Sequence, residues 1–256
     1  MSAPLSAAQR ECILLATEVV RELGRRSRMN RFDHLFPDED TVQPDGSTNY
    51  ARHKYPKHLE FFDAGATYRE RCAMAANRIG KSFGMGGYEM TCHLTGLYPT
   101  WWTGRRFTRP IKAWAAGKTN ETTRDTVQEI LLGESVKLAD GRRTFDGTGL
   151  IPGARIGSLT FKKGGSDLID IAKIRHVSGG WSRLGIKSYE QGRGAFEGTA
   201  QHVIWFDEEP PLGIYGEALI RTATTGGITM LTFTPLEGIS ETVMQFMVGM
   251  HKETED

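Results

Sequence analysis

The chain has 256 residues, of which 39% are hydrophobic and 25% charged, so it is long enough and apolar enough for one large α/β domain with its own core. A formal net charge of +1 excludes a polycation that binds nucleic acid through its overall charge, and no run approaches the ~20 apolar residues that span a bilayer. The N-terminus lacks the pattern of a secretory signal, and three widely spaced cysteines argue against a disulfide framework.

The N-terminal residues predict a helix followed by a linker. Ser6 and Gln9 have the spacing of a capping box, and apolar residues then recur at helical spacing. Gly24 is expected to end this helix, so the arginine-rich residues 25–31 are interpreted as a basic linker. Residues 1–50 are therefore expected to form an N-terminal helical extension.

Between residues 51 and 245, helices and strands alternate as is typical of a single α/β domain. Strands are expected over residues 71–75, 111–116, 168–176, 184–189, 203–206 and 228–233, with a hairpin arm over 159–162. Helices are expected over residues 56–64, 83–95, 120–132 and 214–223. The alternation predicts a mostly parallel central sheet flanked by helices. Residues 246–256 are interpreted as a C-terminal tail.

The segment after the first of these strands resembles a phosphate-binding loop. Residues 75–82 read Ala-Ala-Asn-Arg-Ile-Gly-Lys-Ser, where the usual pattern is Gly, four residues, then Gly-Lys-Ser/Thr. Ala75 replaces the first glycine, so the match is partial. Backbone N–H groups would face the phosphates at the positive end of the following helix. The candidate ATP-binding residues are Ala76, Asn77, Arg78, Ile79, Gly80, Lys81 and Ser82.

Three side chains of this loop have the chemistry that phosphoryl transfer requires. Lys81 would pair with the β- and γ-phosphates, and the Ser82 hydroxyl would bind Mg²⁺. Arg78 would add positive charge beside the transferred phosphoryl group. A rival sequence, Gly117-Lys118-Thr119, also follows a strand and precedes a helix. Its upstream residues read as continuous strand and leave no room for a cradle, so we favour Lys81.

A buried strand that ends in acids supplies the second element. The apolar residues 203–206 are followed by Asp207, Glu208 and Glu209. The carboxyl end of a parallel strand is where such sheets bind ligands. Asp207 would hold Mg²⁺, and Glu208 would act as the general base that polarises the attacking water. The loop and the acids together predict a nucleoside triphosphatase.

A third element follows the next strand. Thr232 and Thr234 stand at its end, and Pro235 comes directly after them. A hydroxyl at this edge of the sheet would sense whether a γ-phosphate is present, and the proline would stiffen the turn. A threonine at the end of a strand is also simply a good strand residue, so this element is informative only together with the other two.

With these elements placed, the chain resembles the ATPase domain of the large terminase subunit of tailed bacteriophages. The resemblance covers residues 55–238. It is carried by the loop at 75–82, Gly96-Leu-Tyr-Pro99, Trp101-Trp102, Pro110-Ile-Lys-Ala-Trp114, Phe196-x-Gly198, Val203–Pro210 and Thr232-Phe-Thr-Pro235. It implies an α/β P-loop NTPase of the RecA-like (ASCE) class that uses ATP and Mg²⁺.

The resemblance also implies a biological setting. Members of this family push double-stranded DNA into a viral procapsid in the host cell cytoplasm, as a ring usually of five subunits docked on the portal protein, and they work with a small terminase subunit. They also cut the genome with a second, nuclease domain. Only 21 residues follow Pro235, so we expect this chain to be an isolated ATPase fragment without nuclease activity.

Further residue roles follow from the resemblance alone. It assigns Lys81, Ser82, Arg78, Asp207 and Glu208 the roles given above, and it gives Thr234-Pro235 the role of coupling hydrolysis to domain movement. Two positions depart from the family pattern. Glu197 stands where a trans-acting arginine is expected, so Arg193 is the substitute candidate. His58 stands where a glutamine is expected to contact adenine.

Two alternatives to a packaging ATPase remain open. Acidic strand ends of this kind also occur in helicase-like DNA-dependent ATPases, although this chain has room for only one such core. A nucleotide-binding switch or scaffold that does not hydrolyse ATP is the other alternative, and the presence of Glu208 beside Asp207 argues against it.

Overall fold

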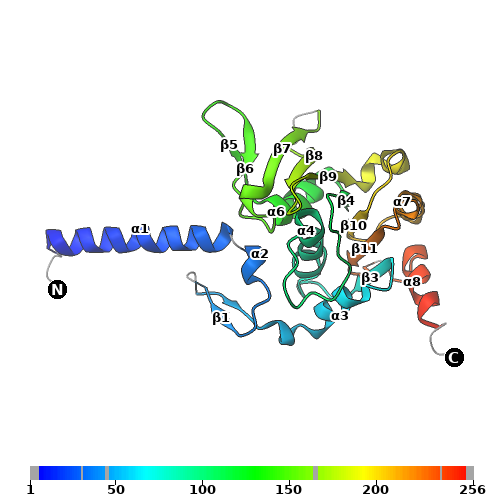
Figure 1. The fold of residues 1–256 in the computed structure, drawn as a ribbon, viewed down its shortest axis with the longest axis horizontal. Helices are drawn as coiled ribbons and strands as arrows, with labels where there is room; N and C mark the ends of the chain where they lie inside the picture. Colours follow the sequence, from blue (N-terminus) through cyan, green and yellow to red (C-terminus); the bar gives the residue numbers. More distant parts are fainter. Residues whose placement is uncertain (1–5, 30, 44–45, 164–166, 237, 252–256) are drawn as a thin grey trace.

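The computed structural model describes residues 6–29, 31–43, 46–163, 167–236 and 238–251, and its central feature is a twisted β-sheet with helices on both faces (Figure 1). The first helix projects away from this body as an arm (Figure 1). None of the helices in these ranges has the length and apolar composition that a bilayer crossing requires.

The central sheet has seven strands in the order β3-β11-β10-β4-β9-β8-β7. Five neighbouring strands, from β3 to β9 in this order, are parallel, and β8 and β7 continue the sheet in antiparallel fashion. The strands are β3 (Glu70–Met74), β11 (Ile228–Phe233), β10 (Val203–Asp207), β4 (Lys112–Gly117), β9 (Trp181–Ser188), β8 (Ile169–Arg175) and β7 (Ile156–Phe161). The predicted mostly parallel sheet is confirmed.

Burial along the strands explains this arrangement. Every residue of β10 and β11 is buried, as continuous apolar strands require when helices cover both faces of a parallel sheet. Buried residues alternate with exposed or half-buried ones in β9, which is the pattern of a strand with one covered face. The sheet is therefore covered on both faces at β10 and β11, whereas β9 has one face that is partly open to solvent.

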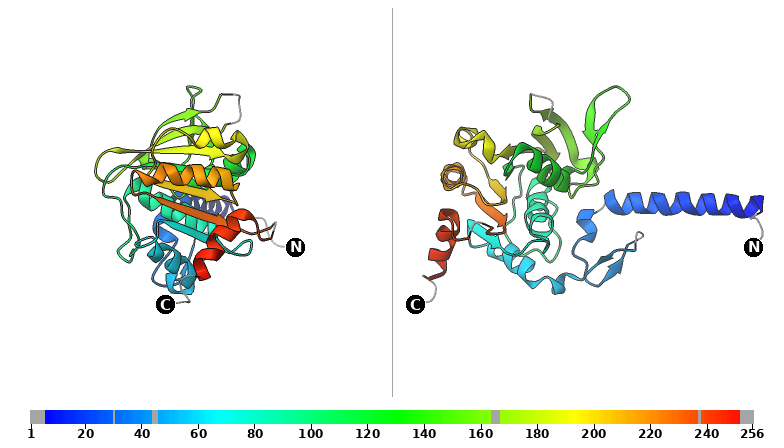
Figure 2. Two further views of the ribbon diagram at one scale, coloured as in Figure 1. Left: turned by 90° about the vertical axis from the view of Figure 1, so that its right-hand side faces the viewer. Right: turned by 180° about the vertical axis from the view of Figure 1, so that it is seen from behind.

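Helices divide between the two faces of the sheet. One face is covered by α3 (Pro56–Ala64), by a helix that runs through η2 (Lys81–Gly87) and α4 (Tyr88–Thr95), and by one that runs through α5 (Asn120–Thr122), η3 (Thr123–Gln128) and α6 (Glu129–Leu132). The other face is covered by α7 (Leu212–Ala223) and α8 (Glu241–His251), which lie in front of the sheet in the left view of Figure 2. The predicted helices over 56–64 and 120–132 are confirmed.

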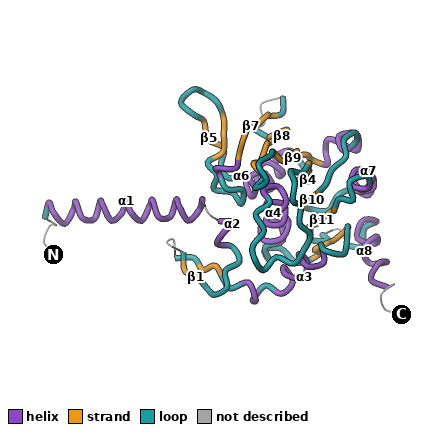
Figure 3. The backbone as a smooth tube through the Cα atoms, viewed as in Figure 1, coloured by secondary structure: helices purple, strands orange, loops and turns teal. Residues whose placement is uncertain are grey.

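Helix α1 (Ala7–Met29) does not end where the sequence predicts. The capping box is present, because Ser6 N–H donates to Gln9 Oε1 at 2.8 Å and Gln9 N–H donates to Ser6 Oγ at 3.2 Å. The expected stop at Gly24 is wrong, and the expected basic linker continues the helix to Met29, as one unbroken coil in Figure 3. A single glycine costs a helix only about 1 kcal/mol, which the flanking helix-forming residues outweigh.

Several shorter elements were not predicted. Helix α8 crosses the expected boundary between residues 245 and 246, and residues 252–256 of the expected tail lie outside the described residues. The remaining elements are α2 (Arg31–His34), the pairs β1 (Thr41–Val42) with β2 (Thr48–Asn49) and β5 (Ser135–Lys137) with β6 (Arg143–Phe145), and the 3₁₀ turns η1 (Arg52–Lys54), η4 (Gly153–Arg155), η5 (Tyr189–Gln191) and η6 (Arg193–Phe196).

Candidate nucleotide-binding site

Three functional segments leave the same edge of the sheet. Strand β11 lies between β3 and β10 and is parallel to both, so the carboxyl ends of the three strands are neighbours. In register, Met74 of β3 lies beside Phe233, and Asp207 of β10 lies beside Thr232. The phosphate-loop candidate, the acids and the Thr-Pro segment are therefore adjacent, at the edge where open α/β sheets bind ligands.

The loop between β3 and the following helix has an unusual backbone. Residues 76–80 are exposed, and the helix begins at Lys81. Gly80 has φ 83° and Arg78 has φ 64°, both in the left-handed region. Glycine adopts this conformation freely, whereas a residue with a side chain is strained there by roughly 1–2 kcal/mol. Strain of this kind collects at ligand-binding loops.

A second glycine brings the helix of the loop against the acidic strand. A Cβ added to Gly86 would lie 2.2 Å from the Trp205 ring, so only glycine allows this approach. Trp205 belongs to β10, two residues before Asp207. The close contact therefore sets the distance between the loop and the acids.

Lys81 connects the loop to the end of β11. Its Nζ donates to Ala76 O at 2.7 Å and to Thr234 Oγ1 at 2.8 Å. Burial lowers the pKa of Lys81, and the nearby Asp207 carboxylate opposes this shift. Thr234 Oγ1 also lies 2.9 Å from Ala75 O and 2.7 Å from Asn77 Oδ1. The amine is thus held by the loop and by the Thr-Pro segment at once, beside a carboxylate.

Asp207 is buried at the centre of the site. Thr232 Oγ1 donates to its Oδ1 at 2.9 Å, and Trp205 Nε1 donates to Thr232 Oγ1 at 2.8 Å. Burial raises the pKa of Asp207 to about 6, against the opposite effects of hydrogen bonds from Ser82 and Thr232 and of the Lys81 charge. The carboxylate is therefore held by Thr232 and lies near the hydroxyl of Ser82 and the amine of Lys81.

These donors fit a magnesium ion. Mg²⁺ prefers oxygen ligands and is usually bound by one or two protein groups together with substrate phosphates. The Ser82 hydroxyl and the Asp207 carboxylate are two oxygen groups of this kind that lie near each other. In the described ranges no three His, Cys, Asp or Glu side chains form a metal-binding group, so the chain offers no complete cage of its own.

Glu208 has a strained backbone and a free carboxylate. Its φ is 66°, the left-handed region again, although it carries a long side chain. Its N–H donates to Thr232 O at 3.0 Å, and its carbonyl accepts a hydrogen bond from the Tyr189 hydroxyl at 2.9 Å. Within the described part of the chain its exposed carboxylate has no hydrogen bond or ion pair. The group is thus available to a water molecule.

Two other predicted residues lie in different surroundings. His58 is buried in α3 behind the loop, where a Cβ on Gly84 would come within 3.0 Å of its ring, and burial lowers its pKa. Arg193 lies in η6 on the α7 side, where Nε and Nη2 donate to Glu217 Oε2 at 3.1 and 2.9 Å. The His58 ring supports the loop backbone, and the Arg193 guanidinium is engaged by an acid.

The rival Gly-Lys-Thr sequence forms no comparable cradle. Strand β4 ends at Gly117, and α5 begins at Asn120 with Thr119 as its cap, whose Oγ1 accepts from Thr122 N–H at 3.1 Å. Lys118 is exposed between them. Two residues separate strand from helix here, which agrees with the argument from the sequence that a phosphate loop has no room at this point.

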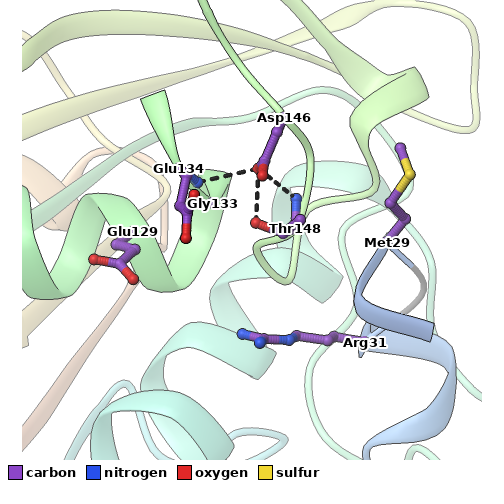
Figure 4. A pocket seen from close by; sticks show the side chains of 7 residues that line it. All are labelled: Met29, Arg31, Glu129, Gly133, Glu134, Asp146 and Thr148. Carbon is purple, nitrogen blue, oxygen red and sulfur yellow. Dashed lines mark hydrogen bonds between the residues drawn. The ribbon is translucent and has the colours of Figure 1, made fainter. Parts of the chain in front are cut away.

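A cavity lies apart from this site, near the base of α1 (Figure 4). It has a volume of about 380 Å³, and it is lined by Met29, Arg31, Glu129, Gly133, Glu134, Asp146 and Thr148. Asp146 Oδ1 already accepts three hydrogen bonds, from Glu134 N–H and from the N–H and hydroxyl of Thr148. The carboxylate closes a turn, so this cavity is not the candidate nucleotide site.

Tyr189 is the residue of the site that sequence reasoning missed. It follows β9, carries no motif, and reaches the acids from two strands away. Its hydroxyl donates to Asp207 O at 2.8 Å and to Glu208 O at 2.9 Å. Burial, followed by the charges of the three acids, raises the pKa of Tyr189 well above its usual value. Only the strand order, which was not predicted, would have revealed this contact.

The sheet, the loop and the acids define an α/β P-loop NTPase of the RecA-like class, with β11 inserted between the loop strand and the acidic strand. The family model of the terminase large subunit, T4likevirus-type, N-terminal, matches residues 72–255, and the chain belongs to this family. A curated relative, the terminase large subunit of Salmonella phage P22, is 41% identical over 217 residues. The match covers 77% of this chain but 42% of the relative, so the chain spans less than half of that protein.

A solved structure has a similar fold. The large terminase of a thermophilic bacteriophage superposes with a TM-score of 0.50 at 12% identity, covering 78% of this chain and 43% of that one. The large terminase ATPase domain of Thermus phage P74-26 is similar at a TM-score of 0.45 and 16% identity, covering 74% of this chain and 71% of that one.

Proposed function

We propose that this chain is the ATPase part of a large terminase subunit and that its hydrolysis of ATP drives double-stranded DNA into a procapsid. The observation that carries the proposal is the position of Lys81, Ser82 and Asp207 at one edge of the sheet, where Lys81 donates to Thr234 and Asp207 accepts from Thr232. A basic group for phosphates, a hydroxyl and a carboxylate lie together beside an exposed loop. This is the equipment of phosphoryl transfer from a nucleoside triphosphate.

The residues of the site divide the chemistry among them. The loop N–H groups of residues 76–81 and the Lys81 amine would bind the phosphates, and Arg78 would add charge at the γ-phosphoryl group. Ser82 and Asp207 would hold Mg²⁺, which neutralises phosphate charge when bound. Glu208 would orient the attacking water and accept its proton. His58 would contribute indirectly, through the loop that it supports.

Thr234 would respond to the state of the nucleotide. Lys81 donates to its hydroxyl at 2.8 Å, and phosphates that drew the amine toward them would break this bond. Thr234 is followed by Pro235, which leads through a short segment to α8. A change at the hydroxyl would therefore be passed to the end of the domain, in line with a coupling role for this pair and a sensing role for the neighbouring Thr232.

The remaining proposals rest on family membership. The partners would be double-stranded DNA, a portal protein, a small terminase subunit and further copies of this chain in a ring, in the cytoplasm of the host cell. Arg193 would act on the ATP of a neighbouring subunit. That role requires its ion pair with Glu217 to open, because both the Nε and Nη2 groups are occupied.

Phosphate release from ATP, measured over a range of protein concentrations, tests the proposal. A trans-acting arginine is worth ~10³–10⁵ in rate, so turnover per chain should rise with protein concentration and should require Mg²⁺. No release at any concentration would favour a nucleotide switch. Strand separation on a forked DNA duplex would favour a helicase-like enzyme instead.

Lys81→Ala should weaken ATP binding about 10- to 100-fold, since it removes a charge-assisted contact to the phosphates. Lys118→Ala should change the affinity by less than about twofold, because this exposed lysine has no cradle around it. Titration with a fluorescent ATP analogue gives both dissociation constants. The reverse order of effects would move the phosphate site to Gly117–Thr119.

A further inference from the structure

The hydrogen bonding of the Tyr189 hydroxyl differs from that of most buried tyrosine hydroxyls. Buried tyrosines usually find one hydrogen-bond partner, and Tyr215 in the same hydrophobic cluster does so with Glu70 Oε2. The Tyr189 hydroxyl instead shares its one hydrogen between two successive carbonyls, Asp207 O at 2.8 Å and Glu208 O at 2.9 Å. These carbonyls belong to the two peptide groups that flank Glu208.

The backbone of Glu208 is therefore held on both sides. Its own N–H donates to Thr232 O at 3.0 Å, and the carbonyls before and after its Cα accept from Tyr189. Fixing both peptide planes fixes φ and ψ, and these angles set the direction in which the side chain leaves the backbone. With φ at 66°, Glu208 is in a conformation that residues with a side chain rarely keep without such restraint.

We propose that Tyr189 is a positioning residue for Glu208, holding the strained turn that presents this carboxylate to the attacking water. The inference rests on the proposed ATPase function. It explains why Glu208 needs no hydrogen bond to its carboxylate from the described residues, since the backbone provides the orientation and leaves the acid free. A base that must accept a proton is best positioned in this way.

The surroundings of Tyr189 make this restraint rigid. Its ring packs beside Phe206 of β10, with ring centroids 5.9 Å apart. Its backbone begins η5 directly after β9, where Ser188 and Gln191 form a capping box. Glu190 N–H donates to Lys118 O, which ties the turn to the end of β4. The hydroxyl is thus fixed by the sheet itself.

Tyr189→Phe tests the proposal, with Tyr215→Phe as the matched control. Each variant removes one buried hydroxyl from the same cluster and keeps the ring. Tyr189→Phe should lower kcat about 10- to 100-fold, because small misplacements of a catalytic group have effects of this size, and it should leave KM for ATP within about twofold. Tyr215→Phe should leave both constants within about twofold. Thermal melting and ATP titration of both variants show that they are folded.

A second measurement separates positioning from a general loss of structure. In a chain that already carries Glu208→Gln, Tyr189→Phe should lower the residual rate no further, since residues that act as a unit are not additive. Unchanged kcat in Tyr189→Phe, a loss shared by Tyr215→Phe, a loss of ATP affinity, or an additive effect in the double variant would each overturn the role of Tyr189. A wild-type chain that releases no phosphate would overturn the proposed ATPase function itself.

Discussion

Glu208→Gln should reduce ATP turnover by about 10²- to 10⁴-fold while leaving the affinity for ATP within about twofold. The amide has the shape of the carboxylate but cannot accept a proton from water. The affinity should persist because the proposed phosphate contacts come from the loop and Lys81, and because Glu208 makes no side-chain hydrogen bond within the described chain. Steady-state phosphate release gives the rate, and equilibrium titration with ATP gives the affinity.

The neighbouring acid provides the control for this variant. Glu209 Oε1 accepts a hydrogen bond from the Ser240 hydroxyl, so its carboxylate is engaged in joining the strand end to the segment before α8. Glu209→Gln should keep turnover within about threefold, because an amide oxygen still accepts this bond. Equal losses in the two variants, or an unchanged rate in Glu208→Gln, would remove Glu208 from the role of general base.

Much of the fold was predictable from local patterns. The short apolar runs of β10 and β11 predict buried strands, and the helix over residues 120–132 has clear periodicity. The prediction that the first helix ends at Gly24 is wrong, because a glycine is a weak stop signal inside a long helix with good helix formers on both sides. Helix α8 was not predicted. It begins at Glu241, directly after the turn-forming residues Gly238 and Ser240, and it lies close to the end of the chain.

Some residues of the candidate site could likewise be predicted from local motifs, and others could not. Lys81, Ser82, Asp207 and Glu208 lie in contiguous motifs, so their chemistry could be inferred before their positions were known. Tyr189 could not be found in this way, because its role depends on the order of strands and on two backbone carbonyls. The positive φ angles of Arg78 and Glu208 could not be predicted either, because arginine and glutamate normally avoid this conformation.

A buried ionic cluster anchors the strand that precedes the candidate phosphate loop. Arg71 of β3 donates to Glu89 of α4 through Nη1 and Nη2 at 3.0 and 2.6 Å, and it also donates to Phe61 O. His93 Nε2 lies 3.0 Å from Glu89 Oε1, and its Nδ1 lies 2.9 Å from the Tyr98 hydroxyl. The Glu89 carboxylate is fully buried and has lost its contacts with water. Arg71 and His93 provide the hydrogen bonds and charge that offset this loss.

Glu89→Gln should lower the free energy of unfolding by about 3–5 kcal/mol, because it leaves the buried guanidinium of Arg71 without a counter-charge. The midpoint of urea unfolding measures this loss. Glu60→Gln, which breaks an exposed pair with Lys57, should cost at most about 1 kcal/mol. If Glu89→Gln lowered the free energy of unfolding by no more than about 1 kcal/mol, the buried guanidinium of Arg71 would not depend on this acid.

The same cluster predicts how stability varies with pH. Burial alone would raise the pKa of Glu89, but Arg71 and His93 together hold it below the ordinary 4.5, while burial lowers the pKa of His93 below 6.5. Both groups bind protons more readily in the unfolded chain, so stability should fall as the pH drops below about 6.5, and further below about 4.5. Glu89→Gln removes the lower step, so the difference in stability between wild type and variant should shrink in acid. A difference that stayed constant down to about pH 3 would show that the Glu89 carboxylate is not the group whose charge stabilises the fold.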